Sequence, residues 1–377
     1  MMKNIPFGSI IKEYTVRAKK DINYPVCSVT NVNGVQKSSD TFSKQVFSND
    51  LSKYKKAFRN SFVYSPPRIN VGSIACQNIE DCVLVSPLYI TFNVDLKFTS
   101  IDFVSLFFKS NYFRNYVKEH TQGSVRANFK MSEMSKLCFP SISKQEQECI
   151  LKEINIINGV IRKDQELVSL FDEMIISKFI ELFGDPNQNH SNMIKIGDVG
   201  VLRSGGTPSR SRPEYFKGTI RWFSAGELNS LYLNDSIEHI TDEAISNSSA
   251  KMFKKGSLMI GMYDTAAFKM GILTNDSASN QACANLEITN SYNAVWLYYV
   301  FSLLKSSYLN ERQGVRQLNL SLSKIKELKF PSAPISTQNE FASFVALVNK
   351  AKLDVEKHCN LYNELLNKKM DEYFRGE

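Results

Sequence analysis

Four short segments of this chain combine glycine or proline turns with arginine, amide and hydroxyl side chains. They are residues 64–70, 123–128, 206–212 and 314–319. Arginine can form two parallel hydrogen bonds to guanine, and asparagine or glutamine can form two to adenine, so such side chains discriminate bases. Glycine also allows a backbone to approach a ligand closely. The segments predict loops that read nucleic acid, although a turn built on a structural glycine explains each of them about equally well.

Basic side chains supply a second kind of contact, because lysine and arginine bind phosphate without reading sequence. The chain carries 46 Lys and Arg against 38 Asp and Glu, a formal net charge of +8, which suits an acidic partner. For any single lysine, a solvated surface position is the commoner explanation. The predicted DNA contacts are Lys55, Lys56, Arg59, Arg68, Asn70, Arg126, Asn128, Thr207, Ser209, Arg210, Arg212, Arg221, Lys269, Arg316 and Gln317.

Catalytic and metal-binding patterns are not found in the sequence. The seven cysteines form no Cys-x-x-Cys pair, and the four histidines have no spacing that would bring two of them to one metal ion. The run 205–207 lacks the Gly-Lys-Ser/Thr ending of a phosphate loop. Ser65-Pro66-Pro67-Arg68 has arginine where an amino-methyltransferase motif has an aromatic residue. We therefore expect no catalytic residue, no metal and no cofactor in this chain, and we expect the strand-like Trp222 and Phe223 to lie in a core.

Three further features of the sequence indicate the compartment. The start lacks the apolar stretch of a signal peptide, and no run approaches the roughly 18 apolar residues that a membrane span needs. Scattered cysteines in an odd number are typical of buried, reduced thiols. The sequence predicts a cytoplasmic protein without a membrane segment.

An internal repeat organises the chain. Gln122-Gly123 and Gln313-Gly314 are followed by matching Asn, Ser, Leu and Phe-Pro-Ser residues at a constant offset of 191 residues (313 − 122). The links that follow, 142–145 and 335–338, both read Ile-Ser-x-Gln at an offset of 193, which suggests a two-residue insertion. Looser matches precede these segments in each half. The chain is therefore expected to contain two related globular domains.

Each link leads into a long stretch with apolar residues at alternating steps of four and three. This spacing keeps one apolar seam facing a partner helix. About 40 residues make a helix of roughly 60 Å, about twice the length of an ordinary core helix. Asp164, Lys178, Lys352 and Lys369 interrupt the seam and would tune its register or face solvent. The predicted helix-partner residues are Ile154, Ile161, Val168, Phe171, Ile175, Val345, Val348, Val355, Tyr362 and Leu366.

The predicted architecture is α+β, with two related recognition domains separated by two long antiparallel coiled-coil helices in a pseudo-twofold repeat. The domains are expected at residues 1–142 and 186–334, and the helices at 143–185 and 335–377. Gly184 and Pro186 cannot continue a helix and mark the boundary between the halves. Single helices are predicted at Phe103–Tyr116 and Ala294–Leu309.

Several segments resemble the DNA-specificity subunit of type I restriction–modification enzymes. The segment Ile196-Gly197-Asp198-Val199, with Ser204–Ser209 and Glu214–Trp222, is similar to the opening of a target-recognition domain in that family. Leu182-Phe183-Gly184-Asp185-Pro186 is similar to its central region, as are the two Phe-Pro-Ser segments. Each motif is short, and the duplicated order over the whole chain carries the resemblance.

The resemblance implies a non-catalytic subunit that reads a split sequence in double-stranded DNA, one part per recognition domain. It implies that the helices dock two methyltransferase subunits, and that a restriction/translocase subunit joins them. S-adenosylmethionine is then expected on the methyltransferase, which flips an adenine out of the stack. The alternatives are a self-sufficient DNA methyltransferase or nuclease, and a coiled-coil scaffold that binds proteins but not DNA.

Overall fold

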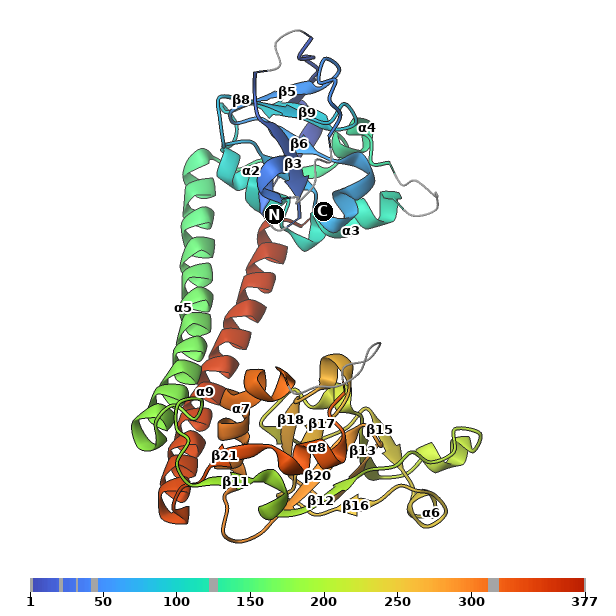
Figure 1. Cartoon of the computed structure of the whole chain (residues 1–377). Coiled ribbons are helices and arrows are strands. Elements are labelled where there is room, and N and C mark those ends of the chain that lie inside the picture. The colour runs from blue at the N-terminus through green and yellow to red at the C-terminus, as the bar shows by residue number, and fades with distance from the viewer. Residues whose placement is uncertain are drawn as a thin grey trace. The chain divides into compact units, whose positions relative to one another are not determined.

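The computed structural model describes residues 3–19, 23–31, 33–41, 47–121, 128–310 and 319–375. It divides into two compact units, Met1–Gln165 with Lys357–Glu377, and Glu166–Glu356. Each unit contains a globular part, which we call a head, together with part of each long helix (Figure 1). The boundary between the units falls inside both long helices, whereas the sequence-based division assigned each helix to a segment of its own.

The first head contains two four-stranded sheets. One has the order β2-β9-β6-β7 and is antiparallel, and the other has the order β4-β3-β8-β5 with a parallel β3–β8 pair. The bounds are β2 Ile11–Tyr14, β3 Val26–Thr30, β4 Gly34–Lys37, β5 Lys55–Phe58, β6 Phe62–Tyr64, β7 Ile74–Cys76, β8 Cys82–Val85 and β9 Ile90–Val94, with a short α1 at Ser38–Thr41. A core of phenylalanines, including Phe7, Phe62, Phe92 and Phe107, fills the space between the first sheet and its helices.

Two helices lie where the sequence predicted one. The helix predicted at Phe103–Tyr116 is wrong, because α2 spans Ile101–Phe107 and α3 spans Asn111–Thr121. The hydroxyl of Ser110 accepts a hydrogen bond from Phe113 N at 3.2 Å and donates to Phe107 O at 2.7 Å. Serine side chains compete for backbone groups in this way at helix ends. The chain therefore breaks into two helices here, although its apolar pattern continues from one helix to the next.

The second head repeats this plan with one additional edge strand, β14. Its sheets have the orders β12-β20-β17-β18-β14 and β15-β13-β19-β16, and the β13–β19 pair is parallel like β3–β8. The bounds are β12 Gly200–Ser204, β13 Ile220–Phe223, β14 Tyr232–Leu233, β15 Glu238–Ile240, β16 Met252–Phe253, β17 Leu258–Gly261, β18 Met270–Leu273, β19 Ser277–Ser279 and β20 Cys283–Ile288, with α6 at Asp242–Ser246 and α7 at Ala294–Asn310. Trp222 and Phe223 lie in β13 with 3% and 1% of their surface exposed, as predicted.

The base of each head is closed by a two-stranded sheet and a short helix. In the first head β1 (Asn4–Pro6) pairs with β10 (Cys138–Pro140), beside α4 (Met131–Met134). In the second head β11 (Met193–Lys195) pairs with β21 (Lys329–Pro331), beside α8 (Leu322–Glu327). Equivalent hydrogen bonds fasten both: Phe7 N donates to Leu137 O at 2.7 Å, and Ile196 N to Leu328 O at 2.9 Å. The predicted α+β repeat is confirmed.

The long helices are α5, Lys144–Phe183, and α9, Ile335–Tyr373 (green and red in Figure 1). They begin 191 residues apart, so the two-residue insertion inferred from the Ile-Ser-x-Gln links is wrong. A buried glutamine near each helix start shows the true alignment. Gln147 Nε2 donates to Ile142 O at 3.2 Å, and Gln338 Nε2 donates to Ala333 O at 2.7 Å. The partners of these glutamines are also 191 residues apart.

The helices pack against each other in antiparallel fashion within each unit. In the first unit Ile150 and Ile154 share a core with Met370 and Phe374. In the second unit Ile175 and Phe179 share one with Phe341, Val345 and Val348. The start of α5 thus meets the end of α9, and the end of α5 meets the start of α9. No helix in the described part of the chain is long and apolar enough to cross a membrane.

Candidate nucleic-acid interface

Two of the predicted reading segments meet in the first head. The turn from β6 to β7 contains a 3-10 helix, Pro66–Val71, and the backbone of Phe129 donates to Pro66 O at 3.3 Å. The hydroxyl of Tyr64 donates to Phe129 O at 3.2 Å. Arg68, Asn70 and Asn128 therefore lie on neighbouring turns, and all three are exposed. Within the described residues, the guanidinium of Arg68 has no hydrogen bond or ion pair, so it is available to a ligand.

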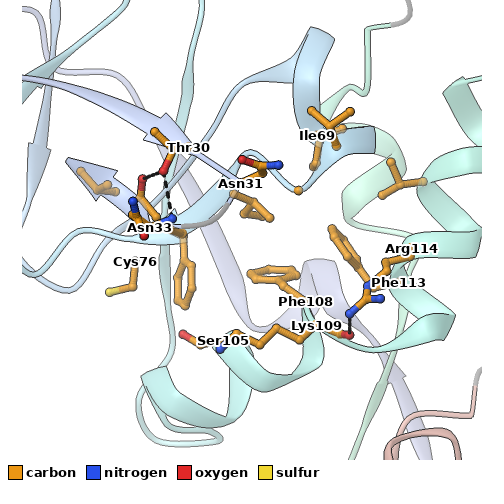
Figure 2. Close-up of a pocket in the computed structure, with 18 of the residues that line it drawn as sticks. Thr30, Asn31, Asn33, Ile69, Cys76, Ser105, Phe108, Lys109, Phe113 and Arg114 are labelled. Carbon is orange, nitrogen blue, oxygen red and sulfur yellow. Dashed lines mark hydrogen bonds between the residues drawn. The ribbon is translucent and has the colours of Figure 1, made fainter. Parts of the chain in front are cut away.

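A cleft of about 670 Å³ opens beside this turn. Figure 2 shows Asn31, Asn33 and Ile69 on one wall, with side chains of α2 and α3 facing them. Arg114 Nη2 donates to Lys109 O at 2.7 Å, which holds two basic residues at the mouth of the cleft. The floor is apolar and the rim carries amides and cations. This surface can bind a polar, negatively charged ligand next to Asn70.

Three predicted phosphate contacts lie in or directly after β5 of the first head, and all three already have partners within the chain. They are Lys55, Lys56 and Arg59. Lys55 Nζ donates to Tyr89 O at 2.6 Å, and burial lowers the pKa of Lys55. Lys56 Nζ lies over a tyrosine ring, 5.0 Å from its centroid. Arg59 Nε donates to Asp81 Oδ1 at 2.9 Å on an exposed surface. Such surface pairs are weak, so phosphate could replace Asp81 more readily than the part-buried carbonyl of Tyr89 that holds Lys55.

The equivalent segments also meet in the second head. Leu320 N donates to Met262 O at 2.9 Å, and Tyr263 forms a β-bridge with Asn319. A pocket of about 450 Å³ lies here, lined by Ser204, Met262, Tyr263, Gln281, Asn319, Ser321, Leu322 and Lys324. The hydroxyl of Thr207 donates to Gln281 Oε1, which brings the predicted segment 206–212 to the same place. Hydroxyl and amide groups dominate this surface.

Arg210 in the second head is held by an intramolecular pair. Its Nη1 and Nη2 atoms donate to the two carboxylate oxygens of Glu238, the second at 2.7 Å. The guanidinium also lies 4.2 Å from the ring centroid of Phe216. The hydrogen bond from Arg210 lowers the pKa of Glu238. A ligand must displace Glu238 before it can use both edges of this arginine.

The other predicted arginines of the second head are similarly engaged. Arg212 Nη1 donates to the hydroxyl of Tyr215 at 2.9 Å. Arg221 Nε is 3.3 Å from Asp235 Oδ1, and this arginine is half-buried in β13. Ser209 Oγ lies 2.8 Å from another serine hydroxyl, and Lys269 is half-buried. The predicted contacts Arg126, Arg316 and Gln317 lie outside the described residues.

Sequence reasoning missed four residues that the duplication points to. Tyr263 follows β17 as the predicted reading turn follows β6, yet the sequence analysis named no residue there. Gln281 lines the pocket and also accepts the hydrogen bond from Thr207. In the first head, the counterpart of segment 206–212 follows β2 and contains the exposed Arg17 and Lys19. Aligning the two halves by strand order would have found Tyr263, Arg17 and Lys19, whereas the structure alone brings Gln281 to this surface. Among the described residues, no group of three or more His, Cys, Asp or Glu could hold a metal ion.

The predicted helix-partner residues form the seam inside each unit. Ile154, Val345 and Val348 are at most 4% exposed, and Ile161 and Ile175 are also buried. Val168, Phe171, Val355, Tyr362 and Leu366 are half-buried. Three of the four charged interruptions form pairs between the helices, whereas Lys178 pairs with Glu181 of its own helix. Asp164 Oδ2 lies 2.7 Å from His358 Nδ1, Lys352 Nζ donates to Asp172 at 2.6 Å, and Lys369 Nζ lies 3.2 Å from Glu153.

A second apolar stripe on the helices faces solvent. Ile156 and Leu347 are 61% and 68% exposed, and Leu170 and Leu361 are 56% and 63% exposed. Met174 and Leu365 form a third exposed pair, and each of the three pairs is 191 residues apart. As a result, each unit carries an equivalent set of three apolar side chains. Exposed apolar patches of this kind mark binding surfaces.

Comparison with known proteins gives a family match over the second half of the chain and a fold for nearly all of it. Residues 189–367 match the model of the type I restriction modification DNA specificity domain. The MjaIX type I restriction enzyme specificity subunit of Methanocaldococcus jannaschii is 26% identical over 187 residues, which cover 48% of this chain and 42% of that protein. The chain spans about two fifths of the length of the curated relatives it matches.

Two solved structures resemble the chain over nearly its whole length. One, from work on complex assembly and conformational transition of the type I R-M system, has a TM-score of 0.64 at 12% identity and covers 99% of this chain and 97% of its own. The type I restriction-modification S subunit of M. genitalium has a TM-score of 0.53 at 14% identity, with 100% and 97% covered. At such identities the likeness shows the fold.

Proposed function

Because residues 189–367 belong to the type I restriction–modification DNA specificity family and the chain has the fold of its subunits throughout, we propose that this protein selects the DNA target of such a complex. Each head reads one part of a bipartite sequence in double-stranded DNA. The chain itself catalyses no reaction. One observation carries the proposal: the same two turns converge in both heads, through Phe129 N to Pro66 O and Leu320 N to Met262 O.

The helices set the distance between the two parts of the target. α5 and α9 contain 40 and 39 residues, or about 60 Å at 1.5 Å per residue. Equivalent faces of a DNA duplex recur about every 34 Å. Inserting one helical turn near Asp164, with a matching turn near His358 to preserve their pairing, should change the preferred gap between the half-sites. An unchanged gap would contradict a ruler built from these helices.

The exposed stripe docks the catalytic subunits. Ile156, Leu361 and Leu365 lie in the first unit, and Leu347, Leu170 and Met174 are their counterparts in the second. A duplicated apolar surface suits two copies of one partner, which we take to be the methyltransferase subunits. These hold S-adenosylmethionine, a restriction/translocase subunit joins them, and the complex works in the cytoplasm.

The direct test combines capture of the partner with mapping of methylation. The full chain is co-expressed with the methyltransferase subunit of its own host, the complex is purified, and plasmid libraries are methylated and sequenced. We expect methylation confined to one bipartite sequence. Leu361→Ser with Leu170→Ser should abolish capture, whereas Leu88→Ser, an exposed leucine in the first head at 75% exposure, should not. Methylation that ignores sequence would refute the proposal.

A further inference from the structure

Gln281 in the second head is exposed, and the hydroxyl of Thr207 holds its side chain in a fixed orientation. We propose that Gln281 reads an adenine in the major groove for this head, and that Thr207 positions its amide. The inference rests on the proposed function, because it names the base that this head selects. Glutamine can donate to N7 and accept from the N6 amino group of adenine, a pattern that no other base pair presents in the same place.

The turn that carries Gln281 is anchored on both sides. Asn280 N donates to Phe223 O at 2.9 Å, and the side chain of Asn280 accepts from Ala282 N at 3.0 Å. Met262 N donates to Ala282 O at 2.9 Å. These bonds tie the neighbours of Gln281 to buried strands, while Gln281 itself is exposed. A rigid turn with one protruding side chain loses little conformational entropy when it binds.

The segment that carries Thr207 is fixed with equal firmness. Gly206 N donates to Ser279 O at 2.9 Å, and the indole nitrogen of Trp222 donates to Gly206 O at 3.0 Å. A Cβ atom added at Gly206 would lie 2.1 Å from Ser249 O, so only glycine allows this approach. The hydroxyl of Thr207 then donates to Gln281 Oε1.

This bond decides which groups Gln281 offers to a ligand. The amide oxygen is held toward Thr207 and keeps a second lone pair, and within the described residues Nε2 has no acceptor. The result is one donor and one acceptor side by side, as adenine requires. Arginine is the commonest partner of guanine, and in the described part of this head Arg203 pairs with Glu287 and lies with its guanidinium carbon 5.3 Å from the ring centroid of Phe253. Arg210 is held by Glu238.

The pocket beside Gln281 also contains an unused acceptor. Asn319 Oδ1 is buried and has no hydrogen-bond partner in the described part of the chain. A buried acceptor without a donor costs free energy. This unsatisfied acceptor belongs to a residue that lines the same pocket as Gln281.

The test is a change of base preference. The full chain, in complex with its methyltransferase subunits, selects duplexes from a randomised pool, and the bound fraction is sequenced. Gln281→Glu removes the donor and leaves acceptors, which suit the amino group of cytosine. We expect one adenine in one half-site to change to cytosine, with a preference shift of roughly 5- to 150-fold. Thr207→Val should weaken the adenine preference without changing the base.

The controls separate this inference from the proposed function. Gln188→Glu makes the same charge change on an exposed glutamine in the linker after α5 and should leave the selected sequence unaltered. Replacing the selected adenine by 7-deazaadenine removes N7, so it should weaken binding of the wild type but not of Gln281→Glu. A wild type that selects two half-sites while Gln281→Glu selects the same ones overturns the inference alone. A wild type that selects no sequence overturns the proposed function.

Discussion

The two heads share a strand order but differ in how their polar residues are engaged. In the first head Arg68 and Asn70 are exposed on a turn and, among the described residues, the Arg68 side chain has no partner. In the second head Arg210 is held by Glu238 and Arg221 by Asp235, while a neutral amide, Gln281, is oriented for contact. A duplicated scaffold thus preserves the place of the reading turns, and each copy fills that place with different chemistry.

The cores of the two units are predicted to differ most at the end of the long helices. Phe374 is 1% exposed, with its ring 5.3 Å from that of Phe103, whereas its counterpart Phe183 is only half-buried. Phe374→Ala should destabilise the first unit by about 3–5 kcal/mol, and Phe183→Ala should destabilise the second by less. Urea unfolding can separate the two, because both tryptophans of the chain lie in the second head.

In that experiment circular dichroism follows both units and tryptophan fluorescence follows the second. Phe374→Ala should shift the circular-dichroism transition of the first unit to lower urea concentration. It should leave the midpoint of the fluorescence transition, which reports the second unit, in place. Phe58→Ala, at a ring that is 41% exposed in the first head, serves as the control and should shift neither. A fluorescence midpoint that moves with Phe374→Ala would show that the two units unfold as one.

The buried glutamines offer a smaller contrast of the same kind. Gln147 accepts from Thr99 Oγ1 at 2.9 Å and from Ser100 N at 3.2 Å, and it donates to two carbonyls. Among the described residues, Gln338 accepts one hydrogen bond, from Asn293 N, and donates one, to Ala333 O. Leucine at either position leaves backbone groups unsatisfied, so we expect losses of about 2–4 kcal/mol for Gln147→Leu and about 1–3 kcal/mol for Gln338→Leu. Equal losses, measured by the same two signals, would contradict the difference in bonding.

DNA recognition should expose the difference between free and paired arginines. Arg68→Ala should lower affinity for one half-site by about 1–3 kcal/mol, because a bidentate base contact is worth that much. Arg210→Ala should change affinity for the other half-site by less, since Glu238 already occupies its guanidinium. Binding of duplexes with one half-site altered at a time measures both. Loss of both half-sites from either variant would argue against two independent readers.

The smallest expected effect concerns the Arg210–Glu238 pair and pH. The hydrogen bond from Arg210 lowers the folded-state pKa of Glu238 below its ordinary value. The pair therefore stabilises the second head fully when the pH lies above the ordinary pKa of a glutamate side chain. This stabilisation is lost as the pH falls through the lowered pKa of the folded state. Because both side chains are partly exposed, Glu238→Gln should cost at most about 1 kcal/mol at neutral pH and nothing in strong acid. Tryptophan-monitored unfolding at several pH values checks this, and a loss that grows in acid would contradict it.

The sequence by itself predicted the repeat and the two long helices, and these predictions are confirmed. The resemblance that it suggested is matched by the DNA specificity domain over residues 189–367. The apolar periodicity and the repeat can be recognised in the sequence alone, because each depends only on residues at fixed separations of three, four or 191 positions. The break at Phe108–Ser110 and the true helix alignment at Gln147 and Gln338 required the structure, since buried polar side chains choose partners that no linear pattern specifies.

The reading residues show the same limit more sharply. Residue type alone gave Arg68, Arg210 and Arg221 equal standing as DNA contacts, and which of them touch DNA stays a prediction. Only the tertiary structure decides that Glu238 and Asp235 reach two of these side chains, and that Thr207 meets Gln281 across 74 residues of chain. A side chain's availability depends on its neighbours in space, and folding brings those neighbours from distant parts of the sequence.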